Sequence, residues 1–83
     1  MSETLAGKVL TREERQLATL ESTHPAWEIR HLPDLAMPWW AVRRIRPTDA
    51  QRAAGVVASF SRVTPELLAA ALARFDEIAH AIR

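Results

Sequence analysis

The chain contains no cysteine, so neither a disulfide nor a closed Cys/His zinc site can form. This matters because a domain of 83 residues has a thin stability margin. A chain of that size buries only about 60–65% of the surface that it exposes when unfolded. Small domains often compensate with disulfides, a metal or oligomerisation. Because the sequence excludes disulfides and a Cys/His zinc site, oligomerisation is the remaining way to add stability.

Catalytic and phosphate-binding patterns are also absent. The only glycines are Gly7 and Gly55, so there is no glycine-rich phosphate loop. The chain has no G-x-S-x-G and no H-E-x-x-H, and Ser59 and Ser61 have no patterned histidine or acid beside them. We therefore expect a protein that is not an enzyme, with no catalytic residue, no cofactor and no metal site.

Long apolar runs are missing as well. No segment approaches the roughly 18 apolar residues that a membrane span requires. The first residues contain no apolar stretch of the kind found in a signal peptide. We expect a cytoplasmic protein that does not bind membranes.

Lysine is scarce, whereas arginine is not: Lys8 accompanies ten arginines, and the net charge is only +1. A GC-rich coding bias explains such a ratio, and so does bidentate recognition of phosphate or carboxylate, which arginine performs better than lysine. The arginines between residues 25 and 63 define a nucleic-acid-binding hypothesis, although the near-zero net charge counts against it. Its residues are Arg30, Arg43, Arg44, Arg46, Arg52 and Arg62.

Two helices are predicted, one near each end of the chain. Residues 1–10 read as a flexible N-terminal arm and residues 11–83 as a single α+β domain. Thr11 followed by Glu14 forms a capping box that starts a helix running to about Ser22. Thr64-Pro65-Glu66 starts a helix that reaches Ile82. We expect it to lie on a sheet through its apolar stripe, Leu67, Leu68, Ala71, Leu72, Phe75, Ile78, Ala79 and Ile82.

Three strands are predicted between these helices. Residues 26–32 and 38–45 alternate as strands of a hairpin, and 56–63 reads as a third strand. The segment that begins at Pro47 is either a loop or a short helix, for which Thr48 with Gln51 fits a second capping box and Gly55 is the end. A single helix over 48–61 is the alternative. The order α-β-β-β-α predicts a three-stranded antiparallel sheet with two helices on one face.

The tandem Trp39-Trp40 carries the sharpest expectation. Adjacent side chains of a strand point to opposite faces, so one ring faces the core and the other the uncovered face. We favour Trp40 and Val42 as inward, with the reverse left open. Trp39 is then either shielded by arginine stems or an interface anchor, since Trp and Arg dominate binding hot spots. The predicted interaction residues are Trp39, Arg43, Arg30 and Glu28.

Three segments of the sequence are similar to those of a known group of proteins: H-P-A-W-E-I, W-W-A-V-R-R and T-P-E-L-L-A-A-A-L. Over about residues 12–75 the chain resembles a group of small, uncharacterised actinobacterial proteins, some encoded beside helix-turn-helix regulators. The resemblance implies an accessory or regulatory role. The element order also matches double-stranded-RNA-binding domains, but these need a basic cluster at the start of the last helix, where this chain has Thr64-Pro65-Glu66-Leu67.

Three functions follow as hypotheses. The first is a non-enzymatic protein-interaction or regulatory accessory module that acts through an open sheet face and possibly self-associates as a homodimer. The second is a nucleic-acid-binding domain that uses the arginines of residues 30–62. The third is a small-ligand-binding or biosynthetic accessory protein. The sequence contains no group of residues that indicates a ligand site or a catalytic site for it.

Overall fold

A computed structural model of the protein describes residues 10–82 and shows a small α+β domain. Its elements follow in the order α1 (Arg12–Thr23), β1 (Trp27–His31), β2 (Trp39–Arg43), α2 (Asp49–Ala53), β3 (Ser59–Arg62) and α3 (Pro65–Ala81). The predicted arm at residues 1–10 lies outside the described residues except for Leu10, which is exposed and whose carbonyl accepts from Arg15 Nη1.

Threonine side chains start all three helices. Thr11 and Thr48 each form a complete capping box, with Glu14 and Gln51 as the returning partners. Thr64 accepts the N–H of Leu67, and Pro65 occupies the first turn of α3. Each hydroxyl satisfies an N–H that has no partner inside its helix. The boundaries of α1 and α3 therefore fall within a residue or so of the predicted ones.

The segment from 48 to 61 divides into a short helix and a short strand. Gly55 follows α2 with a φ of 107°, a backbone conformation that non-glycine residues rarely adopt. The alternative of a continuous helix over 48–61 is therefore wrong. The third strand, Ser59–Arg62, is also shorter than the predicted 56–63, because the Val56 N–H donates to the Gln51 carbonyl over 2.9 Å and so belongs to the turn after α2.

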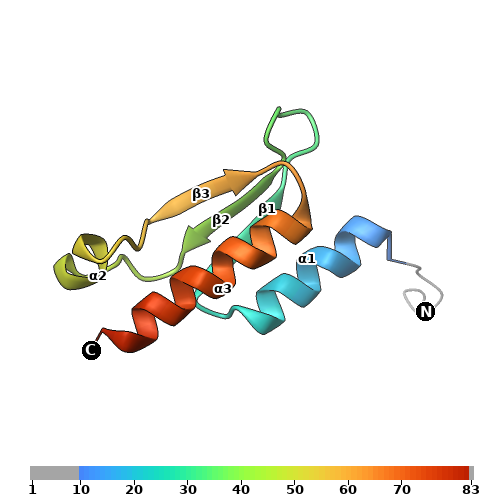
Figure 1. Ribbon diagram of the computed structural model, residues 1–83. Coiled ribbons are helices and arrows are strands. Elements are labelled where there is room, and N and C mark those ends of the chain that lie inside the picture. Colours follow the sequence, from blue (N-terminus) through green and yellow to red (C-terminus); the bar gives the residue numbers. More distant parts are fainter. Residues whose placement is uncertain (1–9, 83) are drawn as a thin grey trace.

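The sheet is antiparallel, with β2 between β1 and β3. Figure 1 shows α1 and α3 side by side on one face of this sheet, while α2 lies beyond its end. The predicted arrangement of two helices on one face is confirmed. The core between the layers consists of Leu20, Trp27, Ile29, Trp39, Ala41, Leu68 and Leu72. Leu67 was expected in this stripe but is 53% exposed.

The register decides which tryptophan enters the core. Ala41 lies opposite Ile29, and His31 lies opposite Trp39, so these residues share the helix-covered face. Trp39 is only 3% exposed, and its ring stacks on that of His31 with 4.4 Å between centroids. The preferred prediction, with Trp40 and Val42 inward, is therefore wrong, and the reverse arrangement holds.

Candidate interaction surface

The face of the sheet that α1 and α3 leave uncovered is formed by two rows of residues. Paired across the strands, Glu28, Val42 and Ser59 form one row, and Arg30, Trp40 and Ser61 form the next. We call these six residues the open face. Glu28 and Arg30 were predicted here and lie here. Trp39 and Arg43, also predicted for this surface, lie on the opposite face, so that part of the predicted site is wrong.

Trp40 is the largest side chain of the open face. It is half-buried, between Arg30 on β1 and Ser61 on β3. Its indole Nε1 is buried, yet it has no hydrogen-bond partner among residues 10–82. A buried N–H without a partner costs about 1–3 kcal/mol. An aromatic ring without an N–H at position 40 would avoid this cost.

The charges of the open face neutralise each other. Arg30 Nη2 and Nε both lie 2.9 Å from Glu28 Oε2. The two side chains stay 57% and 43% exposed, so the pair contributes little to folding. The face is thus electrically neutral with an apolar centre, Trp40 beside Val42.

Apolar surface continues past the open face at the hairpin end. The Leu32 N–H donates to the Pro38 carbonyl over 2.7 Å, which extends the β1–β2 pairing into the connecting loop. Leu32 is 41% exposed, and in the same loop Leu35 and Met37 are each 46% exposed. These side chains enlarge the exposed apolar surface of this part of the molecule.

The two edges of the sheet are less available than its face. The Ile29 N–H does not pair with β2 and instead donates to Glu21 Oε2 over 3.1 Å. On the other edge, Arg62 Nη1 donates to the Ser61 carbonyl over 2.7 Å, and β3 has only four residues. Short strands and side chains that occupy edge groups prevent further strand pairing. A partner would therefore meet the face rather than an edge.

The arginines of the nucleic-acid hypothesis lie on different faces. The Arg43 guanidinium lies 5.3 Å from the Trp27 ring, and that of Arg62 lies 5.0 Å from the Phe60 ring, both on the helix-covered side. Arg30, by contrast, belongs to the open face. Because these three cations point to opposite sides of the sheet, they form no common phosphate-binding surface.

The remaining arginines of that set are also spread out. Arg44 donates to the Pro25 carbonyl and to Glu21, so it fastens the end of β2 to the end of α1. Arg52 pairs with Asp49 on α2. Arg46 is exposed in the loop before α2. The structure brings none of the three next to Arg30.

The end of α1 is joined to α3 by a polar contact that sequence reasoning missed. The Asp76 Oδ2 lies 2.7 Å from His24 Nδ1, and the Asp76 Oδ1 accepts the Trp27 indole N–H over 2.9 Å. Trp27 is fully buried and His24 nearly so. The contact fixes the turn at His24-Pro25 and gives these polar residues a structural role.

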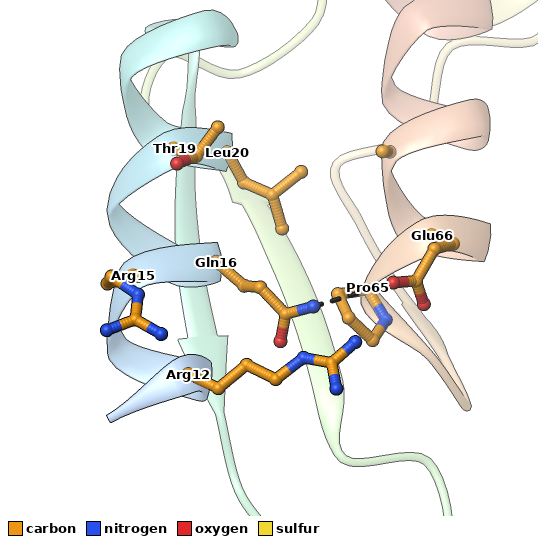
Figure 2. Close-up of a pocket in the computed structure, with 8 residues that line it drawn as sticks. Arg12, Arg15, Gln16, Thr19, Leu20, Pro65 and Glu66 are labelled. Atoms are coloured by element: carbon orange, nitrogen blue, oxygen red, sulfur yellow. Dashed lines mark hydrogen bonds between the residues drawn. The ribbon is translucent and has the colours of Figure 1, made fainter. Parts of the chain in front are cut away.

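A shallow groove separates the first turns of α1 and α3. Figure 2 shows Gln16 reaching across it to Glu66, with 3.4 Å between Nε2 and Oε2. Its walls also carry Arg12, Arg15, Thr19 and Pro65, with Leu20 and Ala69 between the helices. The groove is open to solvent and has a charged wall on either side, so it does not enclose a small molecule.

Within residues 10–82, no three His, Asp or Glu side chains come together to hold a metal ion. None of the helices in that range is both long and apolar enough to cross a membrane. No protein-family model, curated protein or solved structure matches this chain.

Proposed function

We propose that the protein is a non-enzymatic interaction module that binds another polypeptide through its open face. The observation that carries the proposal is the half-buried pair Trp40 and Val42, which lies on the face that the helices leave uncovered, beside an ion pair and exposed apolar loop residues. Tryptophan and arginine are the residues most enriched at binding hot spots. An accessory or regulatory role fits such a module, because a partner would supply any chemistry.

Nucleic-acid binding is the competing function, and the distribution of cations disfavours it. Phosphate binding needs several cations on one surface, and its affinity falls steeply with salt. Here Arg30 is paired with Glu28, while Arg43 and Arg62 lie on the other face. The open face offers a nucleic acid one aromatic ring and no unpaired cation.

Site-specific photocrosslinking tests the proposal directly. A benzoylphenylalanine placed at Ser59, which is exposed on the open face, should form covalent adducts with protein when cells expressing the chain are irradiated. The matched control places the same group at Ala73, which is exposed on α3 on the other side of the sheet. Mass spectrometry of the adducts then identifies whether they contain this chain or another.

Two outcomes would overturn the proposal. Equal adduct yields from Ser59 and Ala73 would mean that the open face has no special partner. Adducts from Ser59 that contain nucleic acid rather than protein would favour the second function. A labelled oligonucleotide that binds at low salt and dissociates as salt rises would independently support that alternative.

A further inference from the structure

We infer that the partner of the open face is a second copy of this chain, packed sheet against sheet. This inference rests on the proposed function and goes beyond it by naming the partner. Its basis is that the two rows of the open face complement each other when one is rotated onto the other. The result is a dimer of four layers, with helices outside and two sheets inside.

A single two-fold axis relates the two copies. It runs across the strands, parallel to the sheet, at the level of Ile29, Ala41 and Phe60, which separate the two rows. Rotation about this axis places each strand over its own copy, running in the opposite direction. The row of Glu28, Val42 and Ser59 then meets the partner's row of Arg30, Trp40 and Ser61. Sheets that pack in this aligned way differ in direction by about 30°.

The charges match under this rotation. Glu28 comes to face the partner's Arg30, and Arg30 faces the partner's Glu28, so two ion pairs form between the copies. Both side chains are accessible enough to turn towards a partner, since they are 43% and 57% exposed. Opposite charges across an interface suppress wrong registers as well as attracting the right partner. An arrangement in which each residue faced the same residue of the other copy would instead oppose Glu28 to the partner's Glu28.

The sizes and polarities match too. Trp40 lies over the partner's Val42, so the largest side chain of the face meets one of its smaller apolar ones. Ser59 lies over the partner's Ser61, so hydroxyl meets hydroxyl. In an isologous interface every such contact occurs twice, which is why one self-complementary surface suffices.

The expected interface is small and therefore weak. Strands lie about 4.8 Å apart and residues about 3.4 Å apart along them, so the three strands cover about 250 Å² in projection. With side-chain relief and the flanking loop, each copy would bury about 500 Å², and the dimer about 1,000 Å², at the low end for specific interfaces. We expect a reversible dimer with a dissociation constant of about 10–100 µM.

Sedimentation equilibrium of the purified full chain provides the first test. Between about 5 and 500 µM, the weight-average mass should rise from that of the monomer towards that of the dimer. The single variants Glu28→Arg and Arg30→Glu should each raise the dissociation constant at least about tenfold, because all facing charges become alike. The Glu28 and Arg30 side chains are 43% and 57% exposed, so circular dichroism should show the same folded domain.

Mixing the two single variants is the decisive experiment. One then presents two cations and the other two anions, so an equimolar mixture should form a heterodimer with an affinity close to that of the wild type. The double variant, Glu28→Arg with Arg30→Glu, should also dimerise. Rescue on mixing cannot come from the pair inside one chain, because mixing leaves each chain with like charges.

Several results would overturn the inference. A wild type that stays monomeric at about 500 µM excludes the dimer at the expected affinity. Single variants that dimerise as well as the wild type, or a mixture that stays monomeric, exclude this arrangement. If the wild type is monomeric while the crosslinker at Ser59 captures a different protein, the proposed function stands and only the second copy is excluded. Absence of both signals removes the function and the inference together.

Discussion

The Asp76 carboxylate accepts the indole N–H of Trp27, with 2.9 Å between Oδ1 and Nε1. The other oxygen of the same carboxylate lies 2.7 Å from Nδ1 of His24. One side chain on α3 thereby holds the last turn of α1 and the first residue of β1. The indole ring packs on Phe60 and Phe75 while its N–H is satisfied, so the largest buried side chain has both apolar and polar partners.

Removing that carboxylate should destabilise the protein. We expect Asp76→Ala to lower the free energy of unfolding by about 2–3 kcal/mol, because it leaves the buried Trp27 N–H without an acceptor. Urea unfolding followed by circular dichroism measures the change. The neighbouring Glu77 is exposed, so Glu77→Ala should cost less than about 0.5 kcal/mol. Equal losses in the two variants would contradict a structural role for Asp76.

Two tryptophans should respond differently to the same substitution. Trp27→Phe removes a satisfied donor and leaves a space in the core, so a loss of about 2–3 kcal/mol is expected. Trp40→Phe removes a buried N–H that has no partner among the described residues, so stability should stay within about 1 kcal/mol of the wild type or rise. Urea midpoints compare the two variants. A larger loss at Trp40 than at Trp27 would refute the placement of these rings.

The left-handed turn after α2 should require glycine. Gly55 has a φ of 107°, and a Cβ built there would meet no atom within 4 Å. The cost of Gly55→Ala therefore comes from the backbone alone, and we expect about 1–2 kcal/mol. Ala54→Gly, at the adjacent right-handed position, is the control, and it should cost under about 1 kcal/mol. Thermal unfolding of both variants measures this, and a neutral Gly55→Ala would disprove it.

Glu21 should protect the β1 edge. Its carboxylate accepts the Ile29 N–H and also lies 3.4 Å from Arg44 Nη2. We expect Glu21→Ala to destabilise the protein by about 1–2 kcal/mol and to speed aggregation, because an edge donor is released. Glu13→Ala, an exposed change on the same helix, is the matched control. Light scattering on warming should separate the two variants, and identical curves would argue against edge protection.

Local signals made much of the fold predictable. Each threonine cap lies directly before its helix, and the residue whose N–H it accepts lies three positions later, so the sequence places the starts of α1 and α3. For residues 48–61 the sequence left a short helix, a loop and a continuous helix open, and the structure shows the short helix α2. The β1 and β2 segments were also predictable, since aromatic and β-branched residues alternate there and Pro33 and Pro38 bound the loop. The resemblance to small actinobacterial proteins stays a prediction, as do the cytoplasmic location and the absence of enzymatic activity.

The candidate site was harder to predict. Trp39 and Trp40 are equally apolar, so alternation assigns them to opposite faces without saying which faces the helices. That choice depends on the register of the hairpin, and a shift by one residue exchanges the two faces. The observed register opposes Trp39 to His31, and this moves Arg43 to the helix side along with Trp39. The correct pair for the open face is therefore Trp40 with Arg30.

Local sequence patterns were enough to place α1 and α3 and to show that Trp39 and Trp40 face opposite ways. These properties depend on residues close in the chain, through caps, glycine conformations and the strand period. The outward position of Trp40 and the contacts of Asp76 with His24 and Trp27 are visible only in the folded structure. Those relationships depend on hairpin register and on contact between distant segments, which local patterns do not specify.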